Sequence, residues 1–573
     1  MKKQLLTITM FTLIGLTNLV NAQTLVWAKA MGGTDYDAGN SMVLDASGNI
    51  FTTGFFTGTV DFDPGAGIFS LTSAGDNDIF ISKLDSAGNF IWAKAMGGTA
   101  IDHGYSIALD GLGNVYSIGE FQATADFDPG VGIFNLTSLS GYDIYISKLD
   151  AAGNFVWAKQ FGSANIDGGR DIAVDASGNV YTTGYFRWTV DFDPGTGTFN
   201  LTSSGGDNGF ISKLDAAGNF AWAIQIGGMG PWIAGDFGYG IATDGTGNVY
   251  TTGTFTDSVD FNPGTDVFKL DAIGGSDVFI SKIDPAGNFV WAKQMGGSNI
   301  NAGNSITVDA TGNVYTTGFF WGTGDFDPGS GTFNLIAYGD KDIFVSKLDA
   351  GGNFVWAKAM GGGGTAVDIG NSIAVDASGN VYTTGFYTGT ADFDPGDGTY
   401  NLFTGWGSSI FFSKLDASGN FVWATRIGGV SGLDGGNSIA LDAYGSVYTT
   451  GAFGGVTDFD PGDGTFNLTA AGASDIFINK MGQTGVGLSE NEWSNTINLF
   501  PNPTTGKFTI DIKNIDGQAA NEIEIYNAFG EKVYTASNIK QQNEIDLSDL
   551  SKGVYFIKMY NGIKIYNQKI VVQ

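Results

Sequence analysis

Short runs of β-branched and aromatic residues, separated by Gly, Asn and Asp, recur along residues 23–481. In the stretch that follows Trp92, these runs occupy 106–110, 115–119, 144–149 and 155–159. Runs of this length bounded by turn residues predict strands joined by hairpins. Some runs are apolar at every position, as at 343–345, which is typical of a sheet covered on both faces. We therefore expect four antiparallel strands in each repeat.

The strand pattern occurs seven times, each time with a Trp-Ala pair in its last strand. The seven tryptophans are Trp27, Trp92, Trp157, Trp222, Trp291, Trp356 and Trp423. Their spacings are 65, 65, 65, 69, 65 and 67 residues, and a fixed period of this kind indicates stacked structural units. Because four antiparallel strands repeated radially form a β-propeller blade, the fold class we predict is all-β.

The two ends of the repeat array complement each other. Residues 25–29 match the last strand of a repeat and have none of its first three strands before them. The final repeat reaches its third strand at 475–480 and never supplies a last strand of its own. We therefore predict a seven-bladed β-propeller over 23–481, in which the N-terminal strand completes the seventh blade.

Charge and composition narrow the classes of function. The chain carries a net charge of −31, and residues 23–481 hold 48 Asp and Glu against 17 Lys and Arg. Such a surface disfavours nucleic acid and anionic membranes and favours cations. The sequence contains no Cys, which excludes disulfides, thiol catalysis and Cys-ligated zinc. His103 is the only His in the chain.

The chain termini carry signals of their own. Residues 1–22 resemble a secretory signal peptide, with Lys2 and Lys3 before an apolar run and Val20-Asn21-Ala22 as the cleavage site. The apolar run is too short to predict a membrane span, and we expect no transmembrane segment elsewhere. Residues 482–496 are a polar linker, and 497–573 form a separate β-rich unit.

Two stretches resemble known families. The repeats, for example Asp-Ala-Ser-Gly-Asn-Val-Tyr-Thr-Thr-Gly at 376–385, resemble the bacterial β-propeller repeat called SBBP. The tail resembles the type A sorting domain of the type IX (Por) secretion system, through Leu-Phe-Pro-Asn-Pro-Thr-Thr-Gly at 499–506 and Leu-Ser-Lys-Gly-Val-Tyr-Phe at 550–556. This second resemblance implies an immunoglobulin-like β-sandwich, the type IX machinery as a partner, and a place outside a Gram-negative cell, secreted or on its outer-membrane surface.

A repeated Asp-Phe-Asp motif is the candidate metal site. Its carboxylates at i and i+2 lie on one side of a strand, and carboxylate oxygens are ligands that suit Ca²⁺. The alternative is that these Asp residues cap a turn while Phe packs beneath it. The residues concerned are Asp61, Asp63, Asp126, Asp128, Asp191, Asp193, Asp325, Asp327, Asp392, Asp394, Asp458 and Asp460.

A second acidic set occupies the loop before the first strand of each repeat. Its members would surround the mouth of a propeller channel, where they could bind a cation, repel anions, or accept hydrogen bonds from loop N–H groups. The set is Asp37, Asp102, Asp167, Asp236, Asn301, Asp368 and Asp434.

Residues that interrupt the repeat are the candidate ligand-binding residues. All map to the propeller face that carries the loops before the first strand and the segments after the second strand, which we call the top face. Exposed Trp and Arg are typical of binding hot spots and sugar platforms, and drift in solvent loops is the alternative. The residues are His103, Glu120, Arg170, Arg187, Trp188, Trp232, Trp321 and Trp406.

Three functions fit these observations. The first is a non-catalytic binding or adhesion protein that presents its top face to a glycan or surface protein. The second is a glycan-active lyase or hydrolase that uses top-face Asp residues with His103 and Arg170. The third is a structural component of a surface layer. Nearly every Asp occupies a repeated position, which is typical of scaffold, and no Ser stands in an activating context, so catalysis is the less favoured interpretation.

Overall fold

The computed structural model describes residues 23–203, 205–228, 235–262, 266–429, 434–483, 497–512, 522–527, 532–537, 539–560 and 565–573. The predicted signal peptide lies outside these residues, as does most of the predicted linker. The chain divides into two compact units, 1–483 and 484–573. The regular elements of the described residues are all strands, as the sequence predicts.

The first compact unit is built from seven four-stranded antiparallel units in the described residues, which we number 1 to 7 by their innermost strand. The innermost strands are β2 (Ala38–Leu44), β8 (Asp102–Leu109), β12 (Gly168–Val174), β18 (Phe237–Thr243), β24 (Ala302–Val308), β30 (Ile369–Val375) and β34 (Gly435–Leu441). Each is paired to a second strand: β3 (Ile50–Phe56), β9 (Val115–Asp126), β13 (Val180–Phe186), β19 (Val249–Phe255), β25 (Val314–Phe320), β31 (Val381–Asp392) and β35 (Val447–Phe453).

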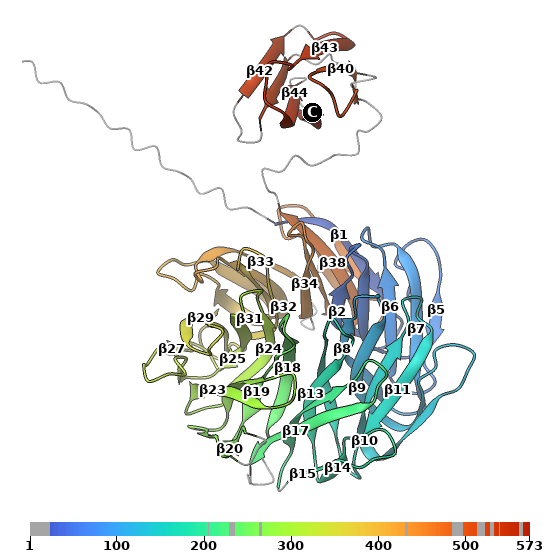
Figure 1. Ribbon diagram of the computed structural model, residues 1–573, viewed down its shortest axis with the longest axis vertical. Coiled ribbons are helices and arrows are strands. Elements are labelled where there is room, and N and C mark those ends of the chain that lie inside the picture. The colour runs from blue at the N-terminus through green and yellow to red at the C-terminus, as the bar shows by residue number, and fades with distance from the viewer. Residues whose placement is uncertain are drawn as a thin grey trace, which may run out of the picture. The chain divides into compact units, whose positions relative to one another are not determined.

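The third and outermost strands complete each unit. The third strands are β6 (Asp78–Leu84), β10 (Asn135–Leu149), β16 (Asn208–Leu214), β22 (Asp277–Ile283), β28 (Asp342–Leu348), β32 (Asn401–Leu415) and β38 (Asp475–Gln483). The outermost strands are β7 (Phe90–Gly98), β11 (Phe155–Phe161), β17 (Phe220–Gly228), β23 (Phe289–Gly297), β29 (Phe354–Gly362), β33 (Phe421–Gly429) and β1 (Gln23–Met31). Figure 1 shows the units side by side around a common centre.

The segment between the second and third strands forms a small hairpin, which carries the Asp-Phe-Asp-Pro-Gly sequence in every unit but the fourth, where Asn262 replaces the second Asp. In units 2 and 6 it is continuous with the long strands β9 and β10, or β31 and β32. In the other units it is separate: β4 (Thr59–Asp61) with β5 (Ser70–Thr72), β14 (Thr189–Asp191) with β15 (Asn200–Thr202), β20 (Ser258–Asp260) with β21 (Lys269–Asp271), β26 (Thr323–Asp325) with β27 (Asn334–Ile336), and β36 (Val456–Asp458) with β37 (Asn467–Thr469).

The N-terminal strand pairs with the last unit, as predicted from the two incomplete repeats. Strand β1 runs antiparallel to β38, with Lys29 opposite Ile478 and Ala30 opposite Phe477. The ring of Trp27 meets that of Tyr448 edge to face at 6.2 Å, the same contact that Trp157 makes with Tyr116 inside unit 2. The innermost strands β2 and β34 also contact each other, so unit 1 and unit 7 are neighbours.

The hydrophobic core lies between the units. One cluster joins Tyr116 and Ile144 of unit 2 to Phe186 and Phe210 of unit 3, and similar clusters join the other neighbours. Between units 7 and 1 the cluster joins Ile478 of unit 7 to Phe56 of unit 1. Each sheet is therefore covered on both faces, which explains the strands that are apolar at every position.

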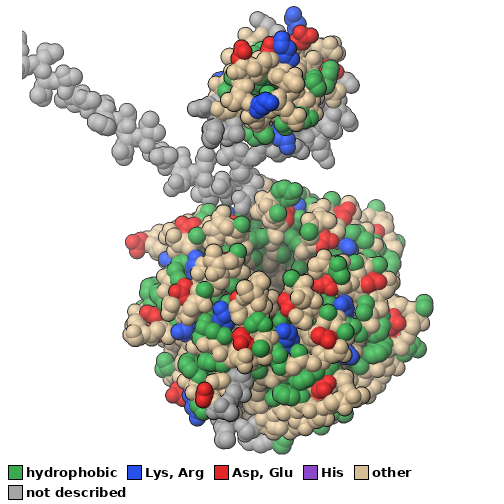
Figure 2. Space-filling view, viewed as in Figure 1, with side chains coloured by type: hydrophobic (Ala, Val, Ile, Leu, Met, Phe, Trp, Pro, Cys, Tyr) green, Lys and Arg blue, Asp and Glu red, His purple; other side chains and the backbone are tan. Residues whose placement is uncertain are grey.

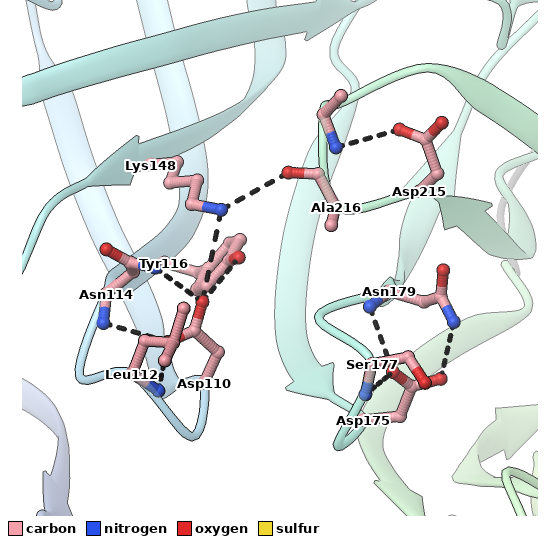
Figure 3. Close-up of polar contacts among 11 residues, drawn as sticks. Asp110, Leu112, Asn114, Tyr116, Lys148, Asp175, Ser177, Asn179, Asp215 and Ala216 are labelled. Atoms are coloured by element: carbon pink, nitrogen blue, oxygen red, sulfur yellow. Dashed lines mark hydrogen bonds and ion pairs between the residues drawn. The ribbon is translucent and has the colours of Figure 1, made fainter.

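The turn between the first and second strands, with the sequence Asp-x-x-Gly-Asn, is closed by hydrogen bonds to its Asp side chain. In unit 2 the Asp110 carboxylate accepts hydrogen bonds from the backbone N–H groups of Leu112 and Asn114, both at 2.9 Å, and from the Tyr116 hydroxyl at 3.0 Å (Figure 3). Lys148 lies over the Tyr116 ring and donates to the Ala216 carbonyl of unit 3 at 3.2 Å. The turn thereby ties neighbouring units together.

The second compact unit is a pair of antiparallel sheets. One contains β39 (Ile497–Phe500), β40 (Lys507–Ile512) and β43 (Gln542–Asp546), and the other contains β42 (Lys532–Ser537), β41 (Glu522–Tyr526), β44 (Gly553–Tyr560) and β45 (Ile565–Val572). A single core joins the two sheets through residues such as Phe508, Ile510, Ile525 and Ile557. Two sheets sharing one core define a sandwich-like arrangement.

Candidate functional site

A β-bulge in every innermost strand defines a ring of equivalent positions. In each of the seven pairings the register shifts by one residue near the start of the strand, for example between Gly104 and Ser106. A bulge redirects one side chain, and bulges are common beside functional sites. The residues at this position, which we call the bulge ring, are Asn40, Tyr105, Arg170, Tyr239, Asn304, Asn371 and Asn437.

Four members of the bulge ring are Asn, and they link neighbouring units. The side-chain amide of Asn40 donates to the Gly104 carbonyl of unit 2 at 2.8 Å. The amide of Asn437 donates in the same way to Gly39 of unit 1 at 3.0 Å. Asn304 and Asn371 make the corresponding bonds to the units that follow them. Asn at this position therefore has a structural role.

The other three members are Tyr105, Arg170 and Tyr239, in consecutive units 2, 3 and 4. The guanidinium carbon of Arg170 lies 4.3 Å from the centre of the Tyr105 ring and 5.2 Å from that of Tyr185. Tyr239 stacks on Phe237 with ring centres 5.8 Å apart. Three consecutive units thus exchange the structural Asn for larger side chains, which form an aromatic and cationic arc.

Glu120 and His103 adjoin this arc. The Tyr105 hydroxyl donates to Oε1 of Glu120 at 2.8 Å, and Nδ1 of His103 lies 3.7 Å from the same oxygen. Arg170 approaches Oε2 of Glu120 at 3.9 Å. The Glu120 side chain is only 9% exposed. The structure therefore brings together His103, Glu120 and Arg170, three of the residues that the sequence singled out.

The charge state of the cluster follows from its contacts. Burial opposes ionisation of Glu120, but the His103 contact, the Arg170 charge and the Tyr105 hydroxyl outweigh it and lower the pKa of that carboxyl. Burial raises the pKa of the Tyr105 phenol, which stays protonated. Glu120 is therefore a carboxylate and acts as a hydrogen-bond acceptor.

Arg187 and Trp188 lie in the turn after the second strand of unit 3. Arg187 holds Asp207 with Nε and Nη2 at 2.6 and 2.9 Å. Trp188 is 51% exposed and has a φ of +66°, where the equivalent residues Gly58 and Gly322 are glycines. A bulky residue in this left-handed conformation is strained, and such strain is common at functional sites.

Of the remaining predicted aromatic residues, Trp321 is the one whose side chain is described, and it does not join the cluster. Trp321 is 41% exposed and belongs to unit 5, where its backbone N–H donates to Oδ1 of Asn301. Trp232 lies outside the described residues. Trp406 falls within β32 of unit 6, and its side chain also lies outside the described part of the structure.

The Asp-Phe-Asp carboxylates accept backbone hydrogen bonds. Oδ1 of Asp61 accepts from the N–H groups of Asp63 at 3.0 Å and Phe69 at 2.8 Å, and Asp63 accepts from Gly65. Phe62 is fully buried beneath the turn. The same bonds recur in the other units. This geometry favours turn capping, and among the described residues no three acidic or His side chains gather in a group that could hold a metal. The calcium site stays a prediction.

The acidic residues of the loop before the first strand are buried and also serve the backbone. Asp102 accepts from the N–H groups of Gly98 at 2.7 Å and Gln122 at 3.0 Å, which joins the end of the outermost strand of unit 1 to the end of the second strand of unit 2. Asp37, Asp167, Asp236, Asp368 and Asp434 do the same in their units. Of the three roles that the sequence allowed for these acidic residues, the contacts match the acceptance of hydrogen bonds from loop N–H groups.

Sequence reasoning missed Tyr105, Tyr239 and the Asn members of the bulge ring. Their signal was present in the aligned repeats, where Asn is exchanged for Tyr, Arg and Tyr in three successive units. It could not be weighed without the bulge, because nothing in the sequence alone marks which residue of the first strand is turned out of the strand pairing.

Comparison with known proteins supports the architecture. Residues 156–185, 221–258 and 290–325 match the family model described as a beta-propeller repeat. Residues 498–573 match the model described as a secretion system C-terminal sorting domain. Repeats and sandwich together define the class, an all-β protein with β-propeller repeats. More particularly, the chain carries β-propeller repeats followed by a C-terminal sorting domain, and that domain indicates secretion through the type IX system to the cell surface or extracellular space.

The alignments with known relatives cover only part of each relative's length. The chain is 25% identical over 504 residues to an uncharacterized WD repeat-containing protein of Acanthamoeba polyphaga mimivirus, covering 79% of this chain and 33% of that protein. It is 28% identical over 145 residues to the regulatory protein FlaEY of Caulobacter vibrioides, covering 25% of this chain and 15% of that protein. The chain therefore spans a third or less of these relatives.

Two solved structures share 12% identity with the chain. They are the extracellular domains of a hybrid two-component system and a one-component system of B. thetaiotaomicron. Both alignments cover 93% of this chain, with 61% and 81% of the other chains, and the TM-scores are 0.29 and 0.16. Within the described residues, we also find no helix of a length and apolarity that would cross a lipid bilayer.

Proposed function

We propose that the protein is an exported, non-catalytic binding protein whose seven-bladed propeller, closed by its N-terminal strand, presents a saccharide-binding arc on units 2 to 4. The tail is an immunoglobulin-like sandwich read by the type IX machinery. The observation that supports binding is the loss of the structural Asn at Tyr105, Arg170 and Tyr239, which removes a bond between units in three places. Substitutions that remove a scaffold bond in three adjacent units favour a functional role over drift.

The chemistry of the arc suits a neutral sugar. Aromatic rings pack against the apolar faces of sugars, while Arg and carboxylate groups hydrogen-bond to hydroxyls. Glu120 and Arg170 carry opposite charges and lie 3.9 Å apart, so the pair gives the cluster no net charge with which to attract an anion or a cation. The exposed ring of Trp188 in unit 3 adds an aromatic surface on the same face of the unit.

The ionised state of Glu120 supports binding over hydrolysis. A glycosidase requires one carboxyl that stays protonated to donate to the leaving group. The lowered pKa of Glu120 leaves this carboxylate as an acceptor at neutral pH. Surface proteins remain the second class of ligand.

The test is binding of the secreted protein to a glycan array, with Arg170→Asn as the variant. This change restores the residue that four other units carry, so we expect the fold to be kept and the apparent affinity for retained glycans to fall about tenfold or more. Arg426→Asn, an exposed Arg on β33 of unit 6, is the matched control and should bind like wild type. Wild-type affinity in Arg170→Asn would contradict the proposed site.

Treating target cells with protease or with deglycosylating enzymes distinguishes a saccharide ligand from a protein ligand. Binding that survives protease treatment and is lost on deglycosylation supports a saccharide. The opposite result would point to a protein ligand.

A further inference from the structure

Each junction between neighbouring units buries a pair of polar side chains that belong to different units. One member is the Asp or Asn before the innermost strand of a unit, and the other begins the third strand of the preceding unit. We call these junction pairs. Four are Asp with Asp: Asp37–Asp475, Asp102–Asp78, Asp167–Asp143 and Asp368–Asp342. All eight of these residues are at most 3% exposed.

In the Asp102–Asp78 pair, the two carboxyls converge on Gly97. A Cβ placed on Gly97 would lie 2.7 Å from Oδ1 of Asp78 and 3.0 Å from Oδ2 of Asp102. Oδ2 of Asp78 accepts from the Ala74 N–H at 2.8 Å, while its Oδ1 is buried without a hydrogen-bond partner. Oδ1 of Asp143 is buried without a partner in the same way. Two ionised carboxylates so placed would repel each other and leave an acceptor without a donor.

The junction between units 4 and 5 shows how the geometry is satisfied. There Asn301 replaces the first Asp, and its side-chain amide donates to Oδ1 of Asp277 at 3.1 Å. A Cβ placed on Gly296 would lie 2.3 Å from that oxygen and 2.9 Å from the Asn301 nitrogen, so this pair flanks its glycine much as Asp78 and Asp102 flank Gly97. The amide of Asn has the shape of a protonated carboxyl and supplies the donor that a carboxylate lacks.

We propose that each Asp–Asp junction pair holds one proton between its two carboxyls, so that folding of the propeller takes up protons and the units are joined more firmly in acid than in alkali. A protonated carboxyl donates to its ionised partner, as Asn301 donates to Asp277. Carboxylates that share a site cannot both ionise at ordinary pH without a large cost.

The other titratable groups near the pairs do not supply this donor in the described residues. Around Asp102 and Asp78 they are Tyr142, Tyr145 and His103, whose Nε2 contacts Asn77. Around the other pairs they are Asp35, the Arg187–Asp207 ion pair, Tyr387 and Lys341, whose ammonium lies over the Phe319 ring.

The pH range follows from the pKa values. Burial, with smaller opposing hydrogen bonds, raises the pKa of Asp78, Asp102, Asp143 and Asp368 to about 7 and of Asp37 and Asp342 to about 6. Burial also raises the pKa of Asp167 and Asp475. An Asp in the unfolded chain titrates near 3.9. Because the folded values are the higher ones, the stabilisation is complete below about pH 4 and is lost as the pH rises through about 7.

The experiment measures the melting temperature of the full secreted protein between pH 5.5 and 8. We expect it to fall with rising pH, by roughly 5 °C, in the wild type. The quadruple variant Asp78→Asn, Asp143→Asn, Asp342→Asn and Asp475→Asn supplies a permanent donor at each pair and keeps the partner Asp that accepts two backbone N–H groups. It should fold and lose most of this pH dependence. Asn301→Asp creates a fifth Asp–Asp pair with Asp277, so the melting temperature should fall more steeply with rising pH.

Two outcomes would overturn the proposal. One is a wild-type melting temperature that does not fall over this range, or a quadruple variant that keeps the wild-type slope. The other is a wild type that loses stability on addition of EDTA and regains it with Ca²⁺ at pH 8, because the pairs would then hold a metal in place of a proton. If the quadruple variant fails to fold, the Asn301→Asp variant decides the question. A slope of melting temperature against pH that is no steeper than that of wild type would contradict the proposal.

Discussion

At the scale of single residues, comparison of the repeats distinguishes residues with a structural role from residues that depart from the repeat. Asn is structural at the bulge position because it joins two units by a hydrogen bond, and Asp110 is structural because its carboxylate closes a turn. Sequence analysis identified His103, Glu120 and Arg170 as departures from the repeat, and the structure places them in one cluster. It could not identify Tyr105 and Tyr239, since their importance depends on a bulge that brings residues 65 or more positions apart into one arc.

Trp188 is the residue at which strain and exposure coincide. Trp188→Gly should raise the free energy of unfolding by about 1 kcal/mol, because Gly adopts a φ of +66° without a steric penalty. The same change should weaken binding of the glycans that the wild type retains. Urea unfolding and the glycan array measure the two effects.

The control is Gly322→Trp at the equivalent turn of unit 5, which introduces the strain without the binding surface of unit 3. It should destabilise the protein and leave binding unchanged. A Trp188→Gly variant that gains no stability would show that the native turn is not strained.

At the scale of elements, the strands were predictable and their junctions were not. Runs such as 343–345 lie in strands because a sheet covered on both faces needs apolar residues on both, and that pattern is local. The junction pairs depend on which units become neighbours, so the sequence placed Asp102 in the acidic loop set and did not single out its partner Asp78. The prediction that β1 completes the last unit rested on counting strands and is confirmed by its pairing with β38.

The contribution of β1 is tested through Trp27, whose ring packs on Tyr448 of unit 7. Trp27→Ala should lower the free energy of unfolding by about 3 kcal/mol, since it removes a large aromatic contact at the junction of the chain ends. The midpoint of urea unfolding provides the measurement.

Val26→Ala is the matched control, because Val26 is the next residue of the same strand and is 53% exposed. Its midpoint should stay close to that of wild type. Equal effects of the two changes would argue against a specific role for the Trp27 contact.

At the scale of the whole molecule, the export signal and the proposed binding arc belong to different parts of the chain. The tail has its own core and its own charge balance, with 8 Lys and Arg against 10 Asp and Glu in 482–573. The sorting role of the tail could be predicted from its motifs, because they lie in one continuous stretch that the sorting-domain model matches. The proposed binding arc could not, because its side chains come from three units.

Deletion of 497–573 should leave the propeller folded and trap it in the periplasm. The expected result is loss of the protein from the cell surface and medium, measured by fractionation and immunoblotting, with the periplasmic form still resistant to protease. Arg170→Asn is the matched control, since it changes the binding arc and should be exported normally. Unchanged surface delivery of the truncated protein would contradict the sorting assignment.

The pairing of Gln23 with Gln483 has a consequence for the topology of the chain. The first and last strands of the propeller are paired, so Gln23 and Gln483 could be joined by a short peptide without disturbing any strand. New termini could then be opened at the exposed turn around Tyr444, between the first two strands of unit 7. A circularly permuted chain of this kind should assemble the same sheets, because no unit depends on being the first one made.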